Sequence, residues 1–170
     1  ALMSVDLIAS GFVETNVQET CHVLATAGNS NDINLWKMNN NSNNGISYLT
    51  SLSRHEGPVN KLAFSPDGLH LATAGDTGTI IIWSVPVNMR GNGNGIHYWS
   101  TISREADLRV QIVTSTTSDG IMDHSWSHDS RRLLAGSIDH TVLVVEDVNY
   151  AYNNINNNSA SSTTDPAATT

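Results

Sequence analysis

The stretch LATAGDTGTIIIW, residues 71–83, contains the signals of two short strands joined by a tight turn. Its first part is apolar, its middle carries Gly75, Asp76 and Gly78, and its last part is rich in β-branched residues. Such a pattern is typical of a β-hairpin. The preceding stretch VNKLAFSPDG, residues 59–68, adds an alternating strand and a turn with proline at a favoured position. Together these residues predict a unit of at least three antiparallel strands.

The same unit occurs three times along the chain. LATAG followed by NLW begins at Leu24, and LATAG followed by IIW begins at Leu71, 47 residues later. A weaker third copy begins at Leu133 and has Val145 or Glu146 where the others have tryptophan. No segment keeps a helical period of apolar residues for three turns, so we expect an all-β fold. A repeat of about 45 residues indicates an architecture of stacked or radially arranged units.

The repeats divide the chain into expected segments. We expect a folded region at 1–148 with units at 1–38, 46–87 and 97–148 and polar insertions at 39–45, 88–96 and 107–119. Residues 149–170 consist mainly of Asn, Ser, Thr and Ala and have too few apolar side chains to offset the entropy of ordering. We therefore predict a disordered tail at 149–170.

Composition and charge exclude several classes of protein. The 170 residues include 16 acidic and 8 basic side chains and have a formal net charge of -8, which disfavours a surface for nucleic-acid phosphates and suits basic partners. The single cysteine, Cys21, excludes an internal disulfide framework. No apolar run is long enough for a membrane helix. The chain begins at Ala1 without the features of a signal peptide, as expected for a segment of something longer.

A period of this length, with Gly, Asp and a closing Trp, resembles the WD-repeat β-propeller blade, a four-stranded sheet beside a central channel. The span from Tyr48 to Trp83 resembles the middle, WD-repeat subunits of chromatin assembly factor one, and the related histone-regulator WD chaperones are the next most similar. The resemblance covers residues 2–148. It implies about three blades, the N-terminal part of a seven-bladed ring.

The resemblance also assigns a structural role to particular side chains. It implies that a hydrogen-bond network holds each blade together, with the members His55, Thr73, Asp76, Trp83 and, in the first unit, Trp36. It points to no catalytic, cofactor-binding or metal-binding residue. It assigns no particular residue to contact with partners.

The function implied by the resemblance is that of a non-enzymatic scaffold in a nuclear histone chaperone complex, which helps to deposit core histones onto DNA during replication-coupled nucleosome assembly. Its partners would be the large subunit of a chromatin assembly complex, core histones and other histone chaperones. We expect no cofactor, no membrane and no sequence-specific nucleic acid. Two alternatives stay open: a replication-independent histone-regulator chaperone, or a WD-repeat scaffold of another complex.

Several motifs suggest chemistry when taken alone. His124 and His128 have the spacing of metal ligands on a helix, but they fall on a predicted strand and turn, so we expect no zinc site. The glycines between Gly91 and Gly95 lack the flanking strand and helix of a phosphate-binding loop, so we expect a linker. No serine or cysteine nucleophile has a recognisable base nearby in sequence, and we therefore expect no enzyme.

Two further features are candidates for contact with partners. Trp99 and Trp126 lie outside the closing-tryptophan positions, so one interpretation is that they are exposed. Acidic residues also gather around the third unit, at Glu105, Asp107, Asp119, Asp123 and Asp129. They could attract a basic partner through long-range electrostatics, although a solvated loop is the simpler interpretation.

Overall fold

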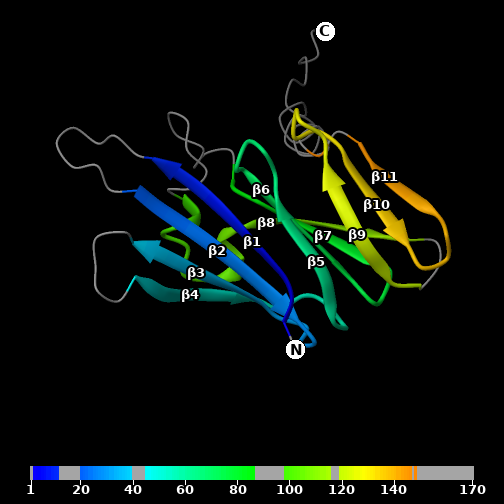
Figure 1. Ribbon diagram of the computed structural model, residues 1–170, viewed down its shortest axis with the longest axis horizontal. Coiled ribbons are helices and arrows are strands. Elements are labelled where there is room, and N and C mark those ends of the chain that lie inside the picture. Colours follow the sequence, from blue (N-terminus) through cyan, green and yellow to red (C-terminus); the bar gives the residue numbers. More distant parts are fainter. Residues whose placement is uncertain are drawn as a thin grey trace, which may run out of the picture.

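The computed structural model describes residues 2–11, 20–39, 45–86, 98–115, 119–146 and 148. Within these ranges, eleven strands form three antiparallel sheets, which confirms the all-β prediction (Figure 1). Among the same residues, no helix is long and apolar enough to cross a membrane. The tail predicted at 149–170 and the insertion predicted at 88–96 lie outside the described residues.

The sheets follow one another along the chain, and each strand pairs with its neighbours in sequence. The first sheet contains β1 (Leu2–Gly11), β2 (Thr20–Gly28), β3 (Ile33–Asn39) and β4 (Ile46–Leu52). The second contains β5 (Val59–Phe64), β6 (His70–Gly75), β7 (Thr79–Ser84) and β8 (Arg109–Thr114). The third contains β9 (Ile121–Trp126), β10 (Leu133–Ser137) and β11 (Val142–Val145). A short 3-10 helix, η2 (Glu105–Asp107), precedes β8.

The first strands of the three sheets line one side of the molecule. β5 contacts both β1 and β9, and the other strands of each sheet extend outward from them (Figure 1). The sheets therefore lie face to face, and each sheet must bury apolar side chains wherever a neighbouring sheet covers it.

The sheets and the sequence repeats are out of phase by one strand. β4 stands at the start of the second repeat but pairs with β3 of the first sheet, and β8 likewise pairs with β7 of the second sheet. Each of the first two sheets thus takes its outer strand from the beginning of the next repeat. The third sheet has three strands among the described residues, and β11 is at its edge.

The polar insertion predicted at 107–119 is wrong for residues 109–114, which form β8. The sequence RVQIVT alternates in period two, and this alternation places Val110 and Val113 on opposite faces, where each packs against a different core cluster. The sequence did not predict this strand because it is short and has polar neighbours on both sides. Its pairing with β7 is also a non-local contact, which local patterns do not reveal.

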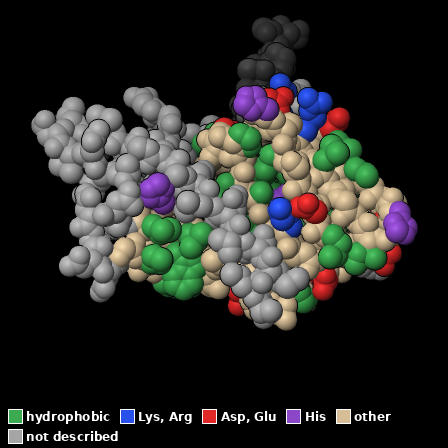
Figure 2. Space-filling view, in the orientation of Figure 1, with side chains coloured by type: hydrophobic (Ala, Val, Ile, Leu, Met, Phe, Trp, Pro, Cys, Tyr) green, Lys and Arg blue, Asp and Glu red, His purple; other side chains and the backbone are tan. Residues whose placement is uncertain are grey.

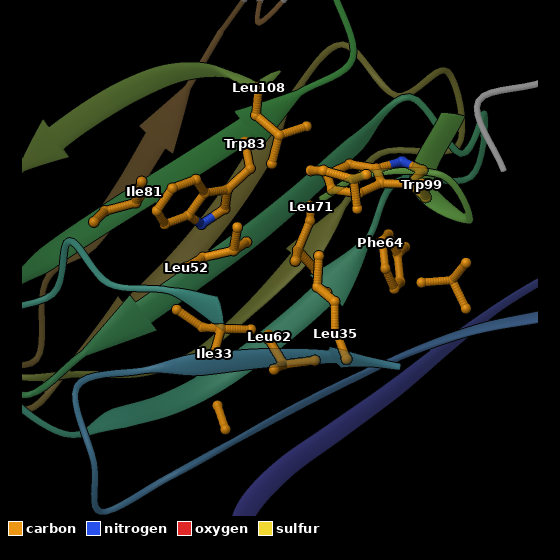
Figure 3. Packing of buried hydrophobic residues seen from close by; sticks show 14 of the residues in the cluster. Ile33, Leu35, Leu52, Leu62, Phe64, Leu71, Ile81, Trp83, Trp99 and Leu108 are labelled. Carbon is orange, nitrogen blue, oxygen red and sulfur yellow. The ribbon is translucent and has the colours of Figure 1, made fainter. Parts of the chain in front are cut away.

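Two apolar layers hold the three sheets together. In each sheet we call the face that carries Leu71 and Trp83, or their repeat equivalents, the leading face, and the opposite one the trailing face. The trailing face of the first sheet, including Ile33 and Leu35, packs on the leading face of the second (Figure 3). The trailing face of the second sheet, including Ile80 and Ile82, packs on the leading face of the third, including Leu133 and Val145.

The tight turns explain why the hairpins form where the sequence predicts them. In the β5–β6 turn Gly68 has φ of 69°, a conformation that side chains other than glycine rarely adopt, and its N–H donates to Ser65 O. The β9–β10 turn makes the same bond from Ser130 N to Ser127 O, with φ of 58° at Ser130. The β5–β6 and β9–β10 hairpin turns, in the second and third repeats, therefore have the same local geometry.

Candidate functional site

The sequence-predicted network is centred on Thr73, whose side chain is fully buried in β6. Its Oγ1 donates to Ile81 O at 3.2 Å and accepts from Trp83 Nε1 at 3.0 Å. His55 Nε2 lies 2.8 Å from the same oxygen, and because the hydroxyl hydrogen goes to Ile81, His55 acts as the donor. These bonds connect the segment before β5 with β6 and β7, so the second sheet is cross-linked through one hydroxyl.

Asp76 lies outside this network. Its Oδ1 accepts from Asn60 Nδ2 at 2.6 Å, while His55 Nδ1 is buried and has no hydrogen-bond partner among the described residues. In the third repeat, the turn aspartate stands two places before the threonine, as Asp139 before Thr141, where it accepts from the Thr141 N–H and hydroxyl. In the second repeat the aspartate, Asp76, stands three places before the corresponding Thr79, which is one place earlier than in the third repeat. Its carboxylate therefore faces the β5–β9 side of the sheet instead of His55.

Trp36 repeats part of this arrangement in the first sheet. Its Nε1 donates to Thr26 Oγ1 at 3.0 Å, as Trp83 does to Thr73. Its ring is only partly buried and meets the Tyr48 ring edge-on, with the centroids 5.5 Å apart. The structure thus places Trp36 on a face that no other described sheet covers.

Gly75 provides a test of how tightly this centre is packed. A Cβ on Gly75 would lie 2.7 Å from Pro58 O and 3.1 Å from His55 Nδ1, and Pro58 O also accepts the Asp76 N–H. We expect Gly75→Ala to lower the free energy of unfolding by about 1–3 kcal/mol in urea denaturation, because backbone must move. The matched control is Gly136→Ala, where a Cβ meets nothing within 4 Å. Equal losses in the two variants would contradict this account.

The two tryptophans considered for partner contact are engaged within the fold. Trp99 is fully buried in the first core cluster, and its Nε1 donates to Gly68 O at 2.9 Å. Trp126 is partly buried, donates to Ala63 O at 3.0 Å and stacks on the His70 ring. Both join β5 or its following turn to later segments, so packing explains them.

Most of the acidic residues around the third unit are paired with cations. Glu105 contacts Arg54, Asp107 contacts Arg104, Asp123 contacts Lys61, and Asp129 lies 4.0 Å from Arg132. A hydrogen bond from Arg104 also holds the pKa of Asp107 below its usual value. Of the five residues singled out in the sequence, Asp119 alone has no cation partner among these ion pairs. The cluster is therefore neutralised by the fold and is a weak attractor for a basic partner.

A different set of acidic side chains gathers at one end of the three sheets. The β2–β3, β6–β7 and β10–β11 turns lie at this end, together with the segments that enter β5 and β9. The acidic residues there, which we call the acidic rim, are Asp32, Glu56, Asp76, Asp119 and Asp139. In Figure 2 acidic atoms lie along the lower edge, which corresponds to this end.

Four members of the acidic rim, Asp32, Glu56, Asp76 and Asp119, take part in none of the ion pairs between described residues. Arg54, which lies before β5, and Lys61, which lies in β5, each pair with an acidic residue outside the rim. The sequence contained the signal for this rim, because Asp32, Asp76 and Asp139 occupy the same turn of successive repeats. These residues are far apart in the sequence, so a search for acidic residues close together in sequence does not find the rim. They come together at one end of the fold because they occupy similar positions in successive repeats.

The histidine pair considered as metal ligands is separated by the fold. His124 is buried in β9, whereas His128 is exposed in the β9–β10 turn. Within the residues described, no group of three or more His, Cys, Asp or Glu side chains converges as metal ligands would. The Gly91–Gly95 segment lies outside the described residues.

Comparisons with known proteins agree with this architecture. The family described as WD domain, G-beta repeat matches residues 46–84 and 109–145, which begin with β4 and β8. The chromatin assembly factor 1 subunit designated B in Schizosaccharomyces pombe is 35% identical over 131 residues, covering 72% of this chain and 24% of that protein. Protein HIR1 of Yarrowia lipolytica is 32% identical over 106 residues, covering 59% of this chain and 9% of that protein.

A solved structure supports the fold at lower sequence identity. The polycomb repressive complex 2 of Chaetomium thermophilum contains a chain that matches with a TM-score of 0.59 and 19% identity, covering 86% of this chain and 25% of that one. The chain is a WD-repeat protein with β-propeller blades. Within this class it resembles the chromatin assembly factor 1 subunit, and it resembles HIR1 less extensively. The chain spans about a quarter or less of the length of these two curated relatives.

Proposed function

We propose that the chain is a non-enzymatic docking scaffold of a nuclear chromatin-assembly complex. In this role it holds a large complex subunit and histone-carrying chaperones while core histones are deposited onto DNA during replication-coupled nucleosome assembly. The similarity to the chromatin assembly factor 1 subunit over 72% of the chain is the observation that carries this proposal. That relative is named as a subunit, which fits a protein that works inside a complex.

The acidic rim supports a basic partner. Five carboxylates at one end of the sheets attract positive charge, and such attraction raises the rate and specificity of association more than its final strength. No bond is made or broken in this mechanism, since the chain contributes shape and charge. A second candidate, a replication-independent histone-regulator chaperone, is favoured by the similarity to HIR1, which covers less of the chain.

Purification of the tagged chain from nuclear extract at moderate salt tests the proposal. Mass spectrometry should identify a large, charge-rich complex subunit together with core histones. Recovery of the components of a histone-regulator complex would instead support the second candidate. Recovery of an unrelated complex without histones would reject both.

Charge neutralisation at the acidic rim is expected to weaken binding of purified core histones. Glu56 and Asp119 are exposed, so Glu56→Gln and Asp119→Asn should leave the fold intact. Each change should weaken binding by about 2- to 5-fold, and the effect should shrink at high salt. Glu146→Gln is the matched control, because Glu146 is exposed at the opposite end of the third sheet. Titrations followed by fluorescence anisotropy measure the difference, and equal effects of Glu56→Gln and Glu146→Gln would mean that the acidic rim is not the contact.

A further inference from the structure

The sequence contains two Asp–Gly pairs, Asp67–Gly68 and Asp119–Gly120, which differ in their surroundings in the fold. In such a pair the glycine backbone nitrogen can attack the aspartate carboxyl group, because glycine has no side chain to obstruct the approach. The attack needs a carboxyl group that is free to turn and an N–H group that no acceptor holds, since a reaction requires its two atoms in a fitting orientation. The hydrogen bonds around each pair therefore decide which of them reacts.

The Asp67–Gly68 pair is held in place by the β5–β6 turn. Its carboxylate oxygen Oδ1 accepts from the Ser65 hydroxyl at 2.5 Å and from the Leu69 N–H at 3.0 Å. The Gly68 N–H donates to Ser65 O at 2.9 Å. Both reacting groups are thus engaged in other bonds, and the turn must open before the attack.

The Asp119–Gly120 pair lacks these restraints. The Asp119 side chain is exposed, and its carboxylate takes part in no hydrogen bond or ion pair with any residue that the structure describes. The Gly120 N–H likewise donates no hydrogen bond within the described ranges, although Gly120 O accepts from Ile138 N at 3.0 Å. The carboxyl group and the nitrogen are therefore both free to react with each other.

The position of Asp119 in its repeat is open even where a sheet lies on either side. Asp119 is separated by one residue from β9, and Gly57 is separated by one residue from β5, so the two positions are equivalent. The sheet of β5 has a neighbour on each side, yet among the described residues a Cβ on Gly57 would meet only Thr77 Cγ2, at 3.0 Å. Thr77 belongs to the β6–β7 turn of the same sheet. A neighbouring sheet therefore does not cover this position.

We propose that Asp119–Gly120 is a site of spontaneous isomerisation, at which the aspartate is converted through a cyclic imide into isoaspartate. The Gly120 nitrogen forms a bond to Asp119 Cγ, and the hydroxyl of the protonated carboxyl group leaves with the amide hydrogen as water. Water then adds to one of the two ring carbonyl groups. If the bond between nitrogen and Cγ breaks, aspartate is restored, whereas if the bond between nitrogen and the main-chain carbonyl carbon breaks, the backbone runs through Cβ and Cγ. The sequence consumes no oxidant or reductant.

The modification lengthens the backbone by one carbon where two sheets meet closely. A Cβ on Gly120 would lie 3.1 Å from Asp76 Cα and 3.2 Å from Asp76 O in the second sheet. Gly120 O also accepts the Ile138 N–H, which ties the segment to the β10–β11 turn. The extra carbon shifts Gly120 relative to these contacts. Isoaspartate at this position is therefore expected to loosen the contact between the second and third sheets and to move one carboxylate of the acidic rim.

Isotope labelling of the folded chain tests the proposal. The purified chain is incubated at neutral pH in water enriched in oxygen-18, and its peptides are prepared in ordinary water and analysed by mass spectrometry. Each passage through the imide introduces one oxygen-18 atom. The peptide with Asp119 should take up label at least about 10-fold faster than the peptide with Asp67, a difference in activation free energy of about 1.4 kcal/mol. Electron-transfer fragmentation should locate isoaspartate at residue 119.

A denatured sample shows whether the fold causes this difference. In guanidinium chloride the peptides with Asp67 and Asp119 should take up label at similar rates, and the incubation lasts until both are labelled there. Equal labelling of the two peptides in the folded chain would overturn the proposal. Labelling of neither peptide in the folded chain would also overturn it, because the fold would then protect both pairs.

Asp119→Glu is the matched control variant. It keeps the charge, but its side chain must close a larger ring, which forms far more slowly, so labelling at this position should disappear. A second readout is enzymatic, since a carboxyl methyltransferase that uses S-adenosylmethionine esterifies the α-carboxylate of isoaspartate and leaves aspartate unchanged. It should methylate residue 119 of the aged chain and not of the variant, and equal methylation there would contradict the proposal. The proposed chemistry does not depend on the role in chromatin assembly.

Discussion

Replacing Trp83 by alanine is expected to lower the free energy of unfolding by about 3–5 kcal/mol, the largest effect of any single substitution considered for this chain. The Trp83 side chain is fully buried between the first two sheets, beside Leu52 and Leu71 (Figure 3). Its loss leaves a cavity and removes a hydrogen bond to Thr73 Oγ1. A loss of this size is comparable with the whole stability of a marginal domain, about 5–15 kcal/mol. Urea denaturation followed by circular dichroism measures it.

Two further variants separate the causes of this effect. Trp83→Phe keeps most of the apolar volume but removes the indole N–H, so it should cost much less than Trp83→Ala. Trp36→Ala is the matched control, since Trp36 makes the equivalent bond to Thr26 but is only partly buried. A cost for Trp36→Ala as large as that for Trp83→Ala would show that burial between sheets is not what makes Trp83 important.

The strands of each repeat could be predicted because their signals are local. The alternation in VNKLAF and the turn residues Gly75 and Gly78 act within a few positions, and the structure has β5, β6 and β7 in the places they indicate. The offset between repeats and sheets could not be predicted from those signals. It depends on β4 and β8 pairing with the preceding sheet, and pairing partners are chosen by contacts made only in the folded chain.

The candidate sites show the same division between local and non-local information. The Thr73–Trp83 bond follows from cross-strand register, which the hairpin fixes. The Asp76 side chain does not join the predicted network with His55, because a shift of one residue in a tight turn turns it towards Asn60 instead. The sequence identifies the acidic residues as charges, but it does not predict which cations pair with them. Arg54, for example, pairs with Glu105, which lies 51 residues away in the sequence. Charge patterns therefore locate candidates, and the fold decides which of them remain available to a partner.

Acidification should destabilise the chain through His55 and His124. Both side chains are 5% exposed, and the pKa of each is lowered to about 4, by burial for His55 and by burial together with the nearby Lys61 charge for His124. His124 has no hydrogen-bond partner for either ring nitrogen among the described residues, and His55 has none for Nδ1. Folding therefore holds both rings in places where the neutral form is strongly favoured.

The direction of the pH effect follows from proton uptake. The unfolded chain binds these protons near pH 6.5 and the folded chain near pH 4, so between these values the unfolded state binds more protons. The free energy of unfolding is therefore highest above pH 6.5 and falls as the pH drops towards 4. Each histidine contributes roughly 3 kcal/mol to this fall. Urea denaturation at a series of pH values between 7 and 4 measures the slope.

Substitution of His124 tests the origin of this slope. His124→Leu removes a buried ring whose nitrogens have no hydrogen-bond partner among the described residues, so we expect stability near pH 5 to rise relative to the unchanged chain and the pH slope to decrease by up to one proton. The control is His128→Gln, because the side chain of His128 is exposed and folding does not take it out of water. An unaltered slope in His124→Leu, or an equal decrease in His128→Gln, would mean that burial of His124 is not what couples folding to pH. The expected result would make the contact between β9 and the second sheet the acid-sensitive part of the molecule.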